Sequence, residues 1–185
     1  MHDEWGPLGP LVGEWEGEGG LDRAYSNRAG EVLSTPYRER LSFKPFGPVE
    51  NGRQVLYGLD YRTAMWRGSE ENPFHTEVGY WLWDAEAHEI VRAFVVPRGI
   101  AVLAGGTAAP RDRSFTLRAE RGDPLYAIGE NAYLSEHAST RSYSVTITLH
   151  DDRSWSYEEV TMLNMAVMAE PFAHTDHNTL RPAAT

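Results

Sequence analysis

The sequence predicts an all-β protein, an antiparallel up-and-down β-barrel of about ten strands with a short N-terminal helical turn. Many short segments alternate apolar and polar residues, most clearly over residues 142–149. Aromatic residues are frequent (six Trp, nine Tyr and six Phe), and Gly and Pro interrupt the chain often, which favours strands over helices. No long helical pattern separates the strand segments, so a parallel α/β fold is not expected. A two-sheet sandwich is the alternative.

Each expected element has its own local signal. The stretch Trp5–Val12, broken by Gly and Pro, would form one helical turn across an end of the barrel. The first strand begins near Gly13 and runs through a glycine-rich stretch that allows bending. Asn51-Gly52 is a strong hairpin signal between two later strands. Further strands are expected over residues 37–44, 54–62, 74–83, 88–96, 100–104, 114–120, 142–150, 155–165 and from about 174 to 181.

Length and composition limit the classes of function. A chain of 185 residues is expected to form one domain, residues 1–185, with a substantial core. The net charge of −10 argues against nucleic acid or an anionic membrane as a partner. Because there is no cysteine, disulfides, thiolate metal sites and cysteine nucleophiles are excluded. The chain shows neither a long apolar run nor a basic, apolar leader, so a cytoplasmic location is expected.

Histidines are the candidate ligands. His174 lies where the last strand begins, and one neutral imidazole can hold heme iron from one side. On an extended strand, His174 and Asp176 face one side and His177 faces the other, so both histidines cannot easily enter one pocket. His75 starts an earlier strand. It either contacts a ligand opposite His174 or forms a structural hydrogen bond with Glu77.

Tryptophans mark the expected interior. Trp81 and Trp83 share the strand face of His75, where they wall a pocket or fill the core. Trp15 is expected to plug the closed end of the barrel, with its ring packed against Arg181.

Other kinds of chemistry find little support. The cluster at residues 174–177 lacks the spacing of a tetrahedral zinc site on one strand. There is no Gly-x-Ser-x-Gly nucleophile motif. Glu158 and Glu159 are adjacent, so they point to opposite faces and make a poor acid–base pair.

Three motifs in this order make the chain resemble the nitrobindins, heme-binding barrels related in shape to the fatty-acid-binding proteins. They are Gly13-x-Trp15-x-Gly17-x-Gly19, Phe74-His75-Thr76-Glu77-Val78-Gly79-Tyr80, and the ending Pro171–His174. The similarity runs from about Leu8 to Leu180. The resemblance implies one ferric heme b per chain with His174 as axial iron ligand and His177 as the second choice.

The resemblance also implies a pocket in which His75 lies on the distal side of the heme and Phe74 and Trp81 form the wall. Nitric oxide binding and isomerisation of peroxynitrite to nitrate would follow, with no catalytic residue assigned. The chain departs from the family at Phe74, where methionine is usual, at Pro97-Arg98, and in an extra loop over Asp123–Ser139.

Two other functions stay open. A heme-free carrier of a fatty acid or another small apolar ligand would need an arginine inside the cavity, with Arg98 or Arg62 as candidates. A structural or protein-binding barrel with a filled interior predicts neither ligand. A homodimer is left open as the oligomeric state.

Overall fold

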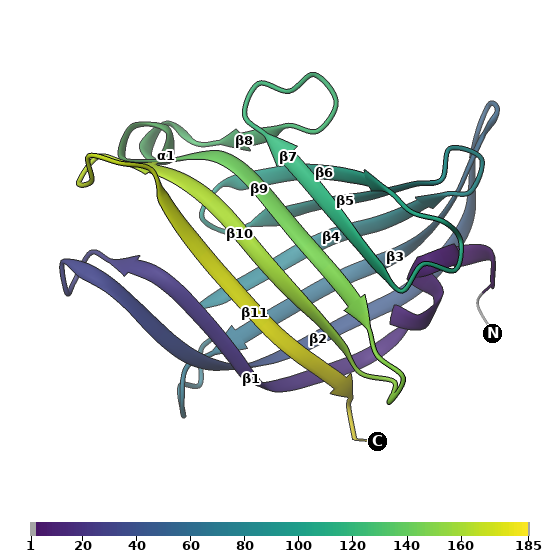
Figure 1. The fold of residues 1–185 in the computed structure, drawn as a ribbon, viewed down its shortest axis with the longest axis horizontal. Coiled ribbons are helices and arrows are strands. Elements are labelled where there is room, and N and C mark those ends of the chain that lie inside the picture. Colours follow the sequence, from purple (N-terminus) through teal and green to yellow (C-terminus); the bar gives the residue numbers. More distant parts are fainter. Residues whose placement is uncertain (1–2, 185) are drawn as a thin grey trace.

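A computed structural model describes residues 3–184, which form a closed antiparallel barrel of ten strands (Figure 1). The hydrogen-bonded order runs β5-β4-β3-β2-β1-β11-β10-β9-β7-β6, and the pairing of β5 with β6 closes the ring. The predicted all-β barrel is confirmed. The strands are β1 (Gly13–Ser26), β2 (Glu31–Asn51), β3 (Gln54–Trp66), β4 (His75–Asp84), β5 (Glu89–Val96), β6 (Ile100–Thr107), β7 (Ser114–Glu120), β9 (Ala138–Leu149), β10 (Trp155–Met165) and β11 (Phe172–Pro182).

Most strands lie where the alternation predicts them, and several are longer. The expected turn at Asn51-Gly52 connects β2 and β3. The segment Asp123–Ser139 is more than a loop. It contains the short strand β8 (Ile128–Glu130), which pairs with the start of β6, and the helix α1 (Ala132–His137).

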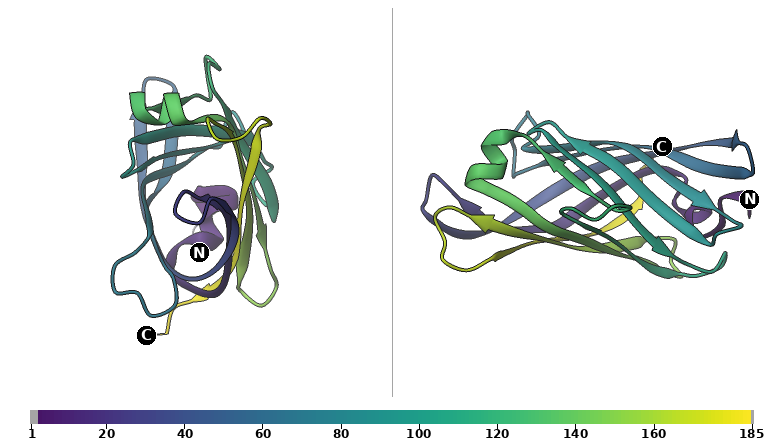
Figure 2. Two further views of the ribbon diagram at one scale, coloured as in Figure 1. Left: turned by 90° about the vertical axis from the view of Figure 1, so that its left-hand side faces the viewer. Right: turned by 90° about the horizontal axis from the view of Figure 1, so that it is seen from above.

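One end of the barrel is closed by the N-terminal segment η1 (Asp3–Leu11), a 3-10 helix interrupted at Gly6. It lies inside the ring of strands when the barrel is viewed along its axis (Figure 2). Leu8 and Leu11 are completely buried. Gly6 has a φ of 51° and lies against the ring of Trp83, so a side chain there would be both strained and crowded. The predicted helical turn across a barrel end is confirmed.

Trp15 forms the next layer above this plug. Its Nε1 donates a hydrogen bond to the Leu11 carbonyl at 2.7 Å, and its ring meets Trp155 edge-on with centroids 6.0 Å apart. The expected packing against Arg181 is wrong. Arg181 is exposed on the outer surface and its Nη1 lies 2.9 Å from Asp152 Oδ2.

A β-bulge in β1 changes which residues face the interior. Gly17 pairs with Glu39 of β2 and Gly20 pairs with Tyr37, so three steps along β1 correspond to two along β2. Before the bulge the odd-numbered Trp15 faces inward, and after it the even-numbered Asp22 does. One extra residue therefore reverses the alternation of the strand and brings a carboxylate inside.

Candidate functional site

A cavity of about 220 Å³ occupies the half of the barrel away from η1. Its rim includes Tyr25, Arg67 and Arg98, which belong to the hairpins and loops at the opposite end of the barrel (Figure 1). Apolar and aromatic side chains form much of its wall: Leu41, Tyr61, Met65, Phe74, Trp81, Val145, Ile147, Trp155 and Tyr157.

The structure brings four of the predicted site residues to this cavity. His174, His75, Phe74 and Trp81 all line it. His177 does not, because the alternation of β11 turns its side chain to the exposed outer surface.

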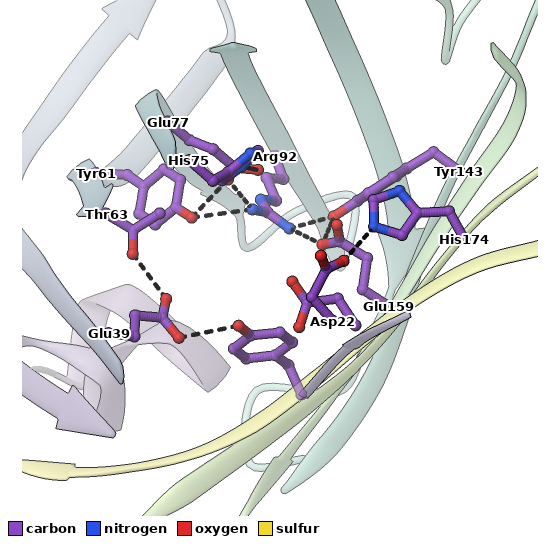
Figure 3. A network of polar contacts seen from close by, with 12 residues as sticks. Asp22, Glu39, Tyr61, Thr63, His75, Glu77, Arg92, Tyr143, Glu159 and His174 are labelled. Atoms are coloured by element: carbon purple, nitrogen blue, oxygen red, sulfur yellow. Dashed lines mark hydrogen bonds and ion pairs between the residues drawn. The ribbon is translucent and has the colours of Figure 1, made fainter. Parts of the chain in front are cut away.

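An ion-pair network crosses the cavity wall (Figure 3). Arg92 of β5 lies 2.5 Å from Glu77 of β4 and 3.1 Å from Glu159 of β10. Its Nη2 also donates to the Tyr61 hydroxyl at 3.0 Å, and its Nη1 contacts the Tyr143 hydroxyl. Arg92 is 4 % exposed, so this buried guanidinium holds together strands that are far apart in the sequence.

The same network sets the protonation of its members. Burial alone would raise the pKa of Glu77, but the charge of Arg92 and the hydrogen bond from His75 hold that pKa below its usual range. For His75 burial would lower the pKa, whereas the hydrogen bond and charge of Glu77, 3.0 Å away, produce a net increase. His75 is therefore biased toward its protonated, cationic form.

A second polar chain starts at Glu39, which is 2 % exposed. Its carboxyl group accepts a hydrogen bond from Thr63 Oγ1 at 2.7 Å (Figure 3). The Tyr157 hydroxyl and Asn178 Nδ2 also donate to it, each at 2.9 Å. The Tyr157 hydroxyl lies 2.7 Å from that of Tyr37.

Tyr37 extends this chain toward the rim, where its hydroxyl donates to Asp176. Burial raises the pKa of Glu39, although its three hydrogen-bonding neighbours lower it in part. Burial, together with the negative charges of Glu159 and Glu39, raises the pKa of Asp176 to about 8. The ion pairs found among residues 3–184 include neither of these two carboxyl groups, so burial favours their neutral, protonated forms.

Each cavity histidine has one ring nitrogen bound to a carboxylate. His174 Nε2 lies 2.6 Å from Asp22 Oδ1, and His75 Nε2 lies 3.0 Å from Glu77 Oε1 (Figure 3). The hydrogen bond predicted between His75 and Glu77 is therefore present. Each carboxylate fixes the tautomer and the ring orientation of the imidazole that it contacts.

Reasoning from the sequence missed several polar residues of this site. Glu39 shares its strand face with Tyr37 and Leu41, so the alternation already indicated an inward carboxyl group. Arg92 gave no such signal, because β5 carries apolar residues on both faces. The inward position of Asp22 could not be predicted, because the bulge in β1 reverses the alternation of the strand before this residue.

Neither Arg98 nor Arg62, the candidate arginines of a fatty-acid carrier, is buried inside the cavity. Arg62 is exposed on β3 and Arg98 is an exposed residue of the rim. The arginine inside the barrel is Arg92, and Glu77 and Glu159 already share its charge.

The donor set suits heme better than a bare metal ion. Among residues 3–184, no three His, Asp or Glu side chains come together in a way that could hold a metal ion. Heme brings four nitrogen ligands of its own and needs only one imidazole from the protein. His174 supplies that donor type at a cavity with an aromatic wall.

Comparison with known proteins agrees with this fold and places it among the heme-binding β-barrels. The family described as THAP4-like, heme-binding β-barrel domain matches residues 4–181. The chain belongs to this family, and the predicted resemblance to nitrobindin-type barrels is confirmed. The family's domain is a heme-binding domain, so heme is the cofactor that membership supports.

Solved structures show the same fold. The crystal structure of Rv2717c from M. tuberculosis superimposes with a TM-score of 0.66 at 18 % sequence identity, covering 96 % of this chain and 95 % of that one. No curated protein matches the chain significantly. Within residues 3–184, no helix has the length and apolar character needed to cross a membrane.

Proposed function

We propose that this chain binds one heme b at the rim of the cavity, with His174 as the axial ligand of the iron. The observation that carries this proposal is the position of His174, an imidazole that lines the cavity and faces the same space as His75, Phe74 and Trp81. His177 is the less suitable ligand because its side chain lies on the exposed outer surface.

The cavity is reached from the end of the barrel that carries Tyr25, Arg67 and Arg98, so we expect heme to enter there and to keep one edge at this rim. Phe74 and Trp81 offer flat apolar surface to the part that enters.

Bound ferric heme with one axial histidine would supply an open coordination position for nitric oxide or peroxynitrite. His75 is the residue of this chain best suited to an anion there. Its contact with Glu77 favours the cationic imidazole, which offers both positive charge and an N–H donor. We therefore propose that His75 orients peroxynitrite and stabilises its negative charge during isomerisation to nitrate.

Carriage of a fatty acid is the less favoured function. The cavity is lined by five carboxyl side chains, those of Asp22, Glu39, Glu77, Glu159 and Asp176. A fatty-acid headgroup would have to enter this acidic surface, while the buried Arg92 is already paired twice.

A hemin titration of the purified protein tests the proposal. We expect a saturable Soret band at one heme per chain, lost in His174→Ala and kept in His177→Ala. The second variant is the matched control, since it removes an imidazole from the same strand on the opposite face. Binding that survives in His174→Ala but not in His177→Ala would move the ligand to the outer surface and overturn the assignment.

A further inference from the structure

The nitrogen of His174 that iron would use is already occupied. Nε2 lies 2.6 Å from Asp22 Oδ1, within the range of a charge-assisted hydrogen bond. The carboxylate is buried, with a side-chain exposure of 8 %, against 35 % for His174. The contact is therefore largely protected from competing water.

The contact determines which ring nitrogen of His174 carries a proton. Asp22 as a carboxylate only accepts hydrogen bonds, so the proton between the two groups resides on His174 Nε2. A neutral imidazole with its proton on Nε2 has its lone pair on Nδ1. Nδ1 is next to the carbon that carries Cβ, so a planar macrocycle approaching it meets the residue's own side chain. The accessible nitrogen is thus protonated, and the nitrogen with the lone pair is hindered.

We infer that Asp22 is a latch on His174 that competes with iron for Nε2 and so weakens heme binding. This inference rests on the proposed function. When Nε2 becomes a ligand, the imidazole must lose the proton at Nε2 and take one at Nδ1, and the hydrogen bond to Asp22 is lost. Asp22 is a positioning residue in this scheme, because it acts through His174.

The backbone of β1 keeps the latch in place. The bulge between Gly17 and Gly20 turns Asp22 inward, and the pairing of Asp22 with Asp176 of β11 places it beside the strand that carries His174. Asp22 is therefore positioned by the register of two strands, since neither strand can shift without changing its whole inward face.

The test is a hemin titration of Asp22→Asn and Asp22→Ala beside the parent protein. Asparagine keeps the shape and a weaker, uncharged acceptor, whereas alanine removes the acceptor. We expect affinity to rise from the parent to Asp22→Asn to Asp22→Ala, by about fivefold or more for alanine, the equivalent of one lost hydrogen bond.

Glu159→Gln is the matched control for charge. It removes one carboxylate from the same cavity, but Glu159 contacts Arg92 and Tyr143 and not His174. An equal gain in Glu159→Gln and Asp22→Asn would show that only cavity charge matters and would overturn the latch.

Nitrogen NMR of the heme-free protein gives a readout that is independent of heme. With ¹⁵N-labelled histidine, the parent should show the Nε2-protonated tautomer for His174, identified by its loss in His174→Ala. Asp22→Ala should shift His174 toward the Nδ1-protonated tautomer. An Nδ1-protonated His174 in the parent would contradict the latch directly.

The outcomes separate the latch from the proposed function. Heme binding by the parent with unchanged or weaker binding in Asp22→Ala overturns the latch and leaves the function standing. Binding by Asp22→Ala alone supports the latch and shows that it keeps the parent closed to heme. Absence of binding in all variants, or full binding in His174→Ala, overturns both.

Discussion

Arg92 Nη2 lies 2.5 Å from Glu77 Oε2, and the side chains are 5 % and 4 % exposed. Their strands β5 and β4 are neighbours, but the other arm of Arg92 reaches Glu159 on β10. One guanidinium thus forms ion pairs with two carboxylates inside the barrel. A buried pair of this kind adds little net stability when complete, yet its disruption leaves uncompensated charge in a poorly solvated place.

Removing Arg92 should therefore destabilise the fold by much more than the small net stability that the complete ion pairs contribute. We expect Arg92→Gln to lower the free energy of unfolding by about 3–5 kcal/mol, as for other broken buried ion pairs. Urea denaturation followed by tryptophan fluorescence measures this. The control is Arg113→Gln, because the pair of Arg113 with Asp151 is exposed and should contribute less than about 1 kcal/mol. Equal effects of the two substitutions would refute the role given to Arg92.

Glu39 should make stability depend on pH. Its folded-state pKa is raised above the ordinary value of 4.5, so the folded state holds the proton more tightly than the unfolded chain. The stability it contributes is complete below pH 4.5 and is lost as pH rises toward the folded-state pKa. Glu39→Gln removes the titration and keeps an acceptor for Tyr157 and Asn178.

The measurement for Glu39 is the midpoint of thermal unfolding across pH. The midpoint temperature of Glu39→Gln, relative to that of the parent, should increase as pH rises from 4.5. Glu158→Gln changes an exposed carboxylate on the outer face of β10 and should reproduce the parent's profile. A constant difference between Glu39→Gln and the parent would mean that Glu39 does not exchange its proton in this range.

The barrel was predictable because alternation and turn signals are local. β10 was predicted with its observed bounds, and the inward face of β4 placed His75 and Trp81 together. The alternation of side chains along β11 likewise placed His174 and His177 on opposite faces of the strand. Each of these inferences needs only one strand and its period of two.

The polar interior was less predictable, because it depends on how strands combine. Asp22 faces inward only after a bulge, which shows itself in pairing with β2 and not in the local sequence pattern. The Trp15–Arg181 expectation failed because the residue that meets Trp15 is Trp155. β8 and α1 are too short to give a periodic signal.

The acidic cavity should reject fatty acids. We expect no saturable binding of a fluorescent long-chain fatty acid at neutral pH, because its carboxylate would meet the carboxyl-rich lining, in which Arg92 is already paired with Glu77 and Glu159. The alcohol of the same chain length is the control for shape. Saturable binding that is lost in Arg98→Gln would show instead that the rim arginine selects a carboxylate.

Gly79 of β4 lies closely against the backbone of β5 in the barrel wall. A Cβ built there would overlap the carbonyl oxygen of Ala93 and lie 2.7 Å from Phe94 Cα, both in the backbone of β5. Because Gly79 pairs directly with Phe94, the strands cannot separate without losing their hydrogen bonds. We expect Gly79→Ala to destabilise the fold by about 1–3 kcal/mol in urea denaturation.

Gly129→Ala is the control for this substitution. Its free energy of unfolding should stay within about 0.5 kcal/mol of the parent's, since no atom lies within 4 Å of a Cβ there. Tolerance of alanine at Gly79 would mean that β4 and β5 can move apart at this point.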